Sequence, residues 1–151
     1  MNGHFRYWCG GREIGNFRLE TSLRDVLFML DGMRRDMGKR QNTRFWNMSP
    51  TDMFRLVDAG LFGKRDVAPL ELSIEEQWAR HNIGPSVDVF DDWKVFVVEN
   101  ETRGRVVFAR HPYTNVEMVE MNAGEVDTTL ESTRAALDEI YEREKAAQQN
   151  P

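Results

Sequence analysis

The sequence has a single cysteine, no long apolar segment and none of the short motifs that mark common enzymes. Cys9 cannot form a disulfide within the chain, so a reducing compartment is favoured and the thiol is interpreted as an ordinary strand residue. No apolar run approaches the roughly 20 residues that a membrane-spanning helix needs. The first residues also lack the basic and apolar regions of a signal peptide. We therefore expect a cytoplasmic protein without membrane contact.

Residues able to bind a metal or to perform catalysis are also sparse. His4, His81 and His111 are far apart and belong to no HxH, HExxH or paired-cysteine pattern. The chain has no GxSxG elbow, Walker motif or GxGxxG motif. The residues form no sharp catalytic constellation, and we expect neither a metal nor a cofactor. A small enzyme whose site converges only in the fold stays open as an alternative.

The length of 151 residues predicts a single domain, 1–151, large enough to bury a core without disulfides or metal. Its net charge of −5 is unevenly placed: residues 1–66 hold 12 basic and 8 acidic side chains, whereas residues 67–151 hold 8 and 17. An acidic half favours a basic partner over nucleic acid. A solvated surface that keeps the protein soluble is the simpler explanation of the same excess.

The stretch 92–111 is predicted to organise the fold. Two runs of β-branched and aromatic residues flank a polar turn at 100–104, which is typical of a hairpin. In the first run, alternate residues on both faces are mostly apolar, so the strand should be covered on both faces. We interpret it as the central strand of an antiparallel sheet.

The rest of the chain predicts an α+β fold. Residues 4–9 and 12–17 form an N-terminal hairpin around Gly10-Gly11, because glycine accepts positive φ at both turn positions. Apolar residues at helical spacing predict a helix over 22–37, and Ser49-Pro50 begins a second. A capping box at 73–76 begins a short helix that ends near His81. A strand at 116–121 and a final helix after Gly124 complete about five strands, as a hairpin and a three-stranded meander, packed with three to four helices.

Basic residues gather in the segment 34–44. Arg34, Lys39, Arg40 and Arg44 lie in or beside a loop that could contact phosphate, without a glycine-rich cradle or interleaved stacking aromatics. A small nucleic-acid-binding regulator that uses this segment is therefore an alternative function, and a solvated loop is the simpler interpretation.

Several segments occur together in a familiar order: FRYWCGGREIGN (5–16), TSLRD (21–25), MFRLVDAGLFG (53–63), WARH (78–81), DVFDDWK (88–94) and AGE (123–125). In this arrangement the chain resembles bacterial immunity proteins that accompany polymorphic toxins, including toxins of contact-dependent growth inhibition. The resemblance covers nearly the whole chain, but its motifs are short and non-catalytic. Its shared residues, such as Gly10, Gly15, Trp93 and Gly124, look like determinants of the fold, so it assigns no interface residue.

The resemblance implies a cytoplasmic protein that binds and neutralises the C-terminal toxin domain of a cognate effector in a 1:1 heterodimer. Many such toxins are nucleases, often acting on transfer RNA, and nuclease surfaces are basic because they bind phosphate. An acidic face on the immunity protein would then speed association and mask that surface. The protein itself would contact no nucleic acid and would not be an enzyme.

A contact surface for a basic toxin is predicted from charge alone. It combines acidic residues before the first strand of the meander, around its first turn and on its edge strand with one aromatic anchor: Asp88, Asp91, Glu99, Glu101, Glu117, Glu120 and Tyr113.

Overall fold

The structure is a computed structural model that describes residues 1–63 and 76–149. The strands are β1 (Asn2–Gly3), β2 (Tyr7–Cys9), β3 (Arg12–Ile14), β4 (Thr21–Ser22), β5 (Trp93–Glu99), β6 (Arg103–Arg110) and β7 (Glu117–Asn122). The helices are α1 (Leu23–Met33), α2 (Thr43–Trp46), α3 (Pro50–Phe62) and α4 (Glu125–Gln149), with 3-10 turns η1 (Arg34–Asp36), η2 (Trp78–His81) and η3 (Asp88–Phe90). The predicted α+β class, N-terminal hairpin and C-terminal meander are confirmed.

The meander is an antiparallel sheet in the order β5-β6-β7. The prediction that residues 93–99 form the central strand is wrong, because β6 lies in the middle and β5 at one edge. Loop segments cover that edge instead of a strand. The Ile83 N–H donates to the Val95 carbonyl at 3.0 Å, and the Glu99 N–H donates to the Arg40 carbonyl at 3.0 Å. Both faces of β5 are buried as predicted.

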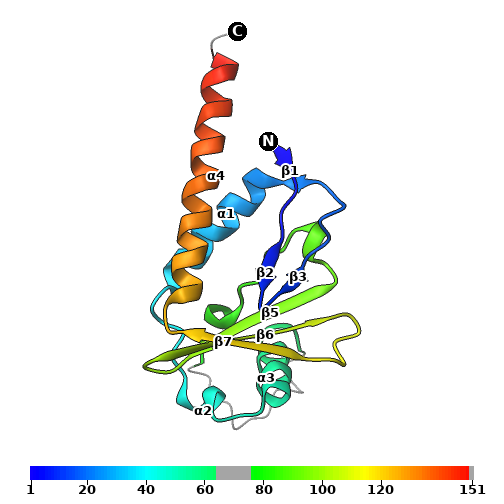
Figure 1. Ribbon diagram of the computed structural model, residues 1–151, viewed down its shortest axis with the longest axis vertical. Coiled ribbons are helices and arrows are strands. Elements are labelled where there is room, and N and C mark those ends of the chain that lie inside the picture. Colours follow the sequence, from blue (N-terminus) through cyan, green and yellow to red (C-terminus); the bar gives the residue numbers. More distant parts are fainter. Residues whose placement is uncertain (64–75, 150–151) are drawn as a thin grey trace.

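The meander separates two apolar cores because its strands alternate. Val95, Val97, Val106 and Phe108 face one core, which the N-terminal hairpin, α1 and α4 complete. On the opposite face, the core contains the alternate strand residues and side chains from α2 and α3: Phe45, Met53, Phe54, Val57, Phe96, Val98, Val107 and Ala109. Figure 1 shows this layering, with α1 and α4 on one side of the sheet and α2 and α3 on the other.

The N-terminal hairpin forms a ladder of its own, separate from the meander. Within the described residues β2 pairs only with β3, and the two turn glycines, Gly10 and Gly11, have φ of +56° and +78°. A methyl group on Gly10 would lie 2.5 Å from a Val119 methyl carbon, so the turn rests directly on β7. A second two-stranded ladder joins β1 to β4.

Serine side chains cap the first turns of α1 and α3. Ser22 Oγ accepts from the Asp25 N–H at 3.2 Å, and Ser49 Oγ accepts from the Asp52 N–H at 3.1 Å, immediately before Pro50. The helix predicted over 22–37 ends earlier, at Met33, and tightens into η1. Residues 78–81 form a 3-10 turn, whereas the predicted capping box at 73–76 lies largely outside the described residues.

A buried ion pair fastens the loop after η1 to the start of α4. Arg40 is completely buried, and its Nε donates to Asp127 Oδ1 at 2.7 Å. The second carboxylate oxygen of Asp127 accepts from the Gly38 N–H at 2.8 Å. Arg40 also bonds the Arg80 carbonyl, while its Nη2 has no hydrogen-bond partner. One carboxylate therefore holds two points of a loop 87 residues away in sequence.

Helix α4 stands out from the body, and its C-terminal turns extend beyond the other elements (Figure 1). It packs on α1, and its buried apolar residues Val126, Leu130 and Leu137 belong to the first core. Near its far end, Glu144 pairs with the amino group of Met1 at 3.3 Å. None of the helices in the described ranges combines the length and apolar character that crossing a bilayer requires.

Candidate functional site: an acidic cleft beside an exposed aromatic hairpin

An acidic cleft of about 450 Å³ lies where the loop after β3 meets η3 and the start of β5. Its charged lining consists of four carboxylates and two guanidinium groups, from Glu13, Asp88, Asp91, Asp92, Arg18 and Arg110. The predicted interface residues Asp88 and Asp91 thus fall in one hollow. The excess of negative charge fits a cationic partner.

The carboxylates of this cleft differ in how they are held. Asp88 Oδ1 accepts from the Thr21 hydroxyl at 2.8 Å and from the Val89 N–H at 2.9 Å, so it also secures η3. Asp92 pairs with Arg110 at 3.2 Å. Asp91 is exposed, and within residues 1–63 and 76–149 no side chain pairs with its carboxylate. Asp91 therefore offers its full charge to a partner.

Exposed aromatic and apolar side chains adjoin this cleft on the hairpin. Trp8 lies opposite Glu13 in the β2–β3 ladder and is 64% exposed. The guanidinium carbon of Arg6 lies 4.1 Å from the Phe17 ring centroid and 5.3 Å from that of Trp8, and its Nη1 is 2.8 Å from Glu13. We call Arg6, Trp8, Glu13, Phe17 and the exposed Leu19 the hairpin surface. It is continuous with the cleft, which Glu13, Phe17 and Leu19 also line.

Sequence reasoning missed the exposed members of this surface. The alternation of residues 4–9 predicts a strand, and a core position for Tyr7 and Cys9 would place Trp8 on the outside. The structure has this arrangement: Tyr7 and Cys9 pack on the core while Trp8 faces solvent. Burial raises the pKa of the Cys9 thiol, which agrees with its interpretation as a strand residue.

The other predicted interface residues do not join Asp88 and Asp91. On β7, Glu117 pairs with Arg12 at 2.8 Å and Glu120 with Arg105 at 3.1 Å, so arginines already balance both. Glu101 lies in the β5–β6 turn, at the opposite end of a seven-residue strand from Asp92.

Two members of the predicted set are also tied to the interior. Glu99 is only 4% exposed and accepts from the Gly124 N–H at 2.8 Å, so the expectation that it belongs to a surface patch is wrong. Tyr113 is half-buried, packs near Phe54 of the second core, and has Lys94 Nζ 4.4 Å from its ring centroid. Tyr113 therefore lies apart from the cleft as a core-supported residue.

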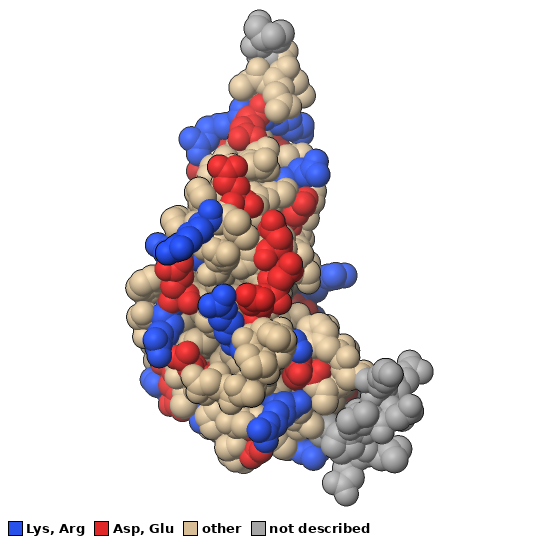
Figure 2. Space-filling view, turned by 90° about the vertical axis from the view of Figure 1, so that its right-hand side faces the viewer, with Lys and Arg blue, Asp and Glu red and all other residues tan. Residues whose placement is uncertain are grey.

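On the face that Figure 2 shows, the acidic side chains of the described residues do not form one continuous patch. Figure 2 shows them in a broken column along the long axis of one face, with basic side chains on both sides. Charge attraction on this face is therefore local. The individual hollows indicate where a partner could bind better than the net charge of the C-terminal half does.

The basic segment 34–44 is not a row of free cations. Arg40, at its middle, is buried against Asp127 and is unavailable to phosphate. Arg34 pairs with Glu131 at 3.1 Å, and Lys39 Nζ donates to the Arg35 carbonyl at 2.7 Å. These contacts weaken the alternative in which this segment binds nucleic acid.

The three histidines have separate structural partners. His81 is buried, with Nδ1 2.8 Å from the Val97 carbonyl and Nε2 3.2 Å from Glu76, and burial lowers its pKa. His4 contacts Phe17, and His111 contacts Tyr113. In the described ranges no three metal-binding side chains gather at a point, and neither His81 nor His111 lines the acidic cleft.

Comparison with protein families shows to which family the chain belongs. The family model described as "Immunity protein 42" (Imm42) matches residues 1–135. The chain belongs to this family. The match covers the hairpin surface, the acidic cleft and the first turns of α4, and it ends within that helix.

The fold of this Imm42 member is also found in a solved structure, "Crystal structure of CdiI from Burkholderia dolosa AUO158". The two share 18% sequence identity with a TM-score of 0.69, over 89% of this chain and 83% of that one. At this identity the likeness shows a shared fold. Comparison with curated proteins gives no significant match.

Proposed function

We propose that this Imm42 member binds the C-terminal toxin domain of a cognate contact-dependent growth inhibition effector in the cytoplasm and neutralises it without turnover. Membership of an immunity-protein family and the fold shared with a CdiI protein support this function. The expected complex is a 1:1 heterodimer, in which the immunity protein uses a preformed surface.

The toxin is proposed to be a basic nuclease, with transfer RNA as a candidate substrate. The observation that carries this proposal is the acidic cleft, where unpartnered Asp91 lies beside Asp88 and next to the exposed aromatics of the hairpin surface. A nuclease has a cationic surface for phosphate, so carboxylates in the cleft would attract the same cations. Exposed aromatics would supply the apolar contact area that charge alone does not.

The test uses the toxin domain encoded by the adjacent open reading frame. Co-expression should restore growth to cells that make this domain, and the purified proteins should form a 1:1 complex that lacks nuclease activity. Failure to protect cells, or failure to bind, would contradict the proposal. A toxin domain with no nuclease activity would contradict only the proposal that the toxin is a nuclease.

Charge reversal separates the cleft from the rest of the acidic surface. Asp91→Lys should slow association severalfold at low salt, and the difference from wild type should shrink above about 0.5 M salt because screening shortens electrostatic range. Glu101→Lys, a reversal at another exposed acidic residue beyond the far end of β5, is the matched control and should change the rate little. Equal effects of the two substitutions would show that net charge, rather than the cleft, steers the toxin.

A further inference from the structure

The outer face of the β2–β3 hairpin carries Trp8, the most exposed large apolar side chain in the described part of the chain. Single exposed apolar residues are common and need no explanation. The Arg6 guanidinium, however, lies over the rings of both Trp8 and Phe17. An aromatic side chain already held in position loses little conformational entropy when it binds.

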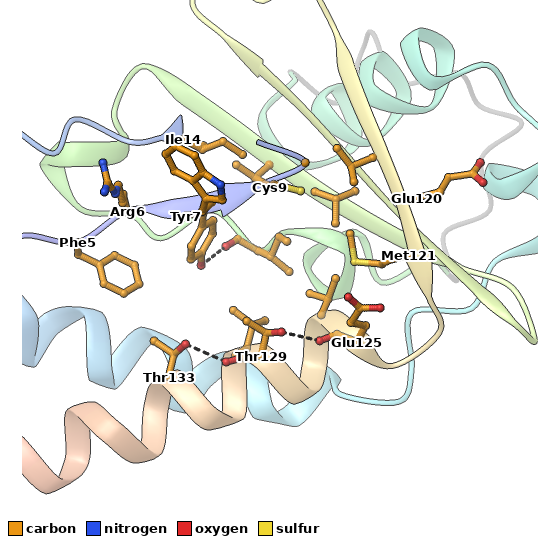
Figure 3. A pocket seen from close by; sticks show the side chains of 18 residues that line it. Phe5, Arg6, Tyr7, Cys9, Ile14, Glu120, Met121, Glu125, Thr129 and Thr133 are labelled. Atoms are coloured by element: carbon orange, nitrogen blue, oxygen red, sulfur yellow. Dashed lines mark hydrogen bonds between the residues drawn. The ribbon is translucent and has the colours of Figure 1, made fainter. Parts of the chain in front are cut away.

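An apolar hollow of about 430 Å³ opens beside Trp8, between β2, β7 and the first turns of α4 (Figure 3). Its apolar lining comes from all three elements and includes Tyr7, Cys9, Val119, Met121, Val126 and Leu130. The hollow has the size of a ligand pocket and a wall made by the first core. It is large enough for one or two side chains and too small for a folded element.

The polar groups inside this apolar hollow are already satisfied. The Tyr7 hydroxyl donates to the Ile83 carbonyl at 2.7 Å, and the Thr129 and Thr133 hydroxyls donate to helix carbonyls at 2.8 Å. Figure 3 shows Tyr7 on β2 and the two threonines on α4 on opposite sides of the space. Apolar atoms can therefore enter without leaving these donors unpaired.

A carboxylate stands at one end of the same space. Glu125 lines the hollow where β7 passes into α4, whereas the Glu120 side chain points away from it (Figure 3) and pairs with Arg105 at 3.1 Å. Among the described residues, Asn122 donates to Glu125 Oε2, at 3.1 and 3.4 Å. The hollow thus presents an apolar interior and a negative end, which fits an apolar side chain with a cation beside it.

We propose that the toxin domain inserts one apolar side chain, adjacent in its sequence or fold to a lysine or arginine, into this hollow, with Trp8 packed against it as the anchor of the interface. The inference rests on the proposed function and adds the location of the contact. The toxin cation lies beside Glu125, and the rest of the toxin surface extends over the hairpin surface toward the acidic cleft. The toxin domain then contacts the hairpin on both of its sides.

Two substitutions test the anchor and the hollow separately, with the purified toxin domain from the adjacent reading frame as probe. Trp8→Ala should raise Kd at least about 30-fold, the loss expected for an interface hot spot. Thr129→Trp places a large ring at the exposed helix face of the hollow and should weaken binding comparably. Phe28→Ala is the matched control, because Phe28 is 54% exposed on α1, away from the hollow lining, and should leave Kd unchanged within about threefold.

Hydrogen exchange of the wild-type complex gives an assay that needs no variant. Amides of residues 7–14 and 118–121 should exchange more slowly when the toxin domain is bound. Circular dichroism and the melting temperature show whether each variant is folded. If a variant loses binding because it is misfolded, hydrogen exchange of the wild-type complex tests the docking site instead.

The outcomes separate the two proposals. A wild-type protein that does not bind the toxin domain refutes the proposed function. A wild-type protein that binds, while Trp8→Ala and Thr129→Trp bind equally well or these amides stay unprotected, overturns the docking site alone. If the free protein is instead a dimer in sedimentation and Trp8→Ala makes it a monomer, a second copy fills the hollow and the inference is wrong.

Discussion

Removing the Asp127 carboxylate should destabilise the protein more than the loss of any surface ion pair. Asp127→Ala deletes the charge-assisted hydrogen bond from Arg40 and the bond from the Gly38 N–H, at 2.7 and 2.8 Å. Hydrogen bonds to a charged group contribute about 1.5–3 kcal/mol each. Arg40 would remain fully buried with an uncompensated charge, a change that costs about 3–5 kcal/mol. The two estimates agree on a loss of about 3–5 kcal/mol.

That loss is a large share of the roughly 5–15 kcal/mol that stabilises an ordinary domain. Urea unfolding followed by tryptophan fluorescence measures it, with Asp92→Ala as the control. Asp92 pairs with Arg110, but both side chains are more than half exposed, so the control should lose less than about 1 kcal/mol.

A double substitution tests the reason for the loss. Arg40→Met combined with Asp127→Leu removes the unpaired charge. It leaves the Gly38 N–H without its acceptor and the part-buried Arg80 carbonyl without its Arg40 donor, so it should recover much of the stability and lie about 1–3 kcal/mol below wild type. A double variant that is as unstable as Asp127→Ala would refute the charge argument. A single variant within 1 kcal/mol of wild type would show that water satisfies the Arg40 side chain.

Further predictions concern the hairpin turn and the buried histidine. Gly10→Ala should lower the free energy of unfolding by about 2–4 kcal/mol, because it adds a methyl group at positive φ against Val119. The methyl group of Gly11→Ala would meet no atom within 4 Å, so this variant should lose only about 1 kcal/mol. Thermal melts compare the two variants. Burial lowers the pKa of His81 below its ordinary value of 6.5, so the unfolded chain binds the proton more readily than the folded one. The free energy of unfolding should therefore fall as the pH drops below 6.5. It should fall more steeply than in His81→Gln, by up to about 1.4 kcal/mol per pH unit, and urea titrations from pH 8 to 5 measure this difference.

The local elements were predictable because each follows from neighbouring residues. The apolar spacing of Val26, Leu27 and Leu30 predicts the buried face of α1, and all three are buried. Alternating apolar residues correctly predict burial of both faces of β5. They do not indicate what covers its edge, and the loops around Gln41 and Asn82 do so in place of a further strand.

The buried polar residues were not predictable, because their partners are distant in sequence. Arg40 lies among other basic residues in a loop, and only its pairing with Asp127 on α4 explains its burial. Glu99 looks like an exposed turn residue until the start of α4 is placed beside it. Within the candidate site, the acidic composition indicates Asp88 and Asp91, but their separation from Glu101 follows from the path of the strands.

The independent ladder of the hairpin has a consequence for how immunity to different toxins diverges. Its inward side chains, Tyr7, Cys9 and Ile14, belong to the core, whereas Trp8 and Glu13 face solvent and share no ladder with the meander. In the proposed complex, the outward residues of the hairpin would contact the toxin and could be exchanged one at a time without loss of the folding scaffold. Toxin specificity could then change at the hairpin while the remainder of the molecule stays constant.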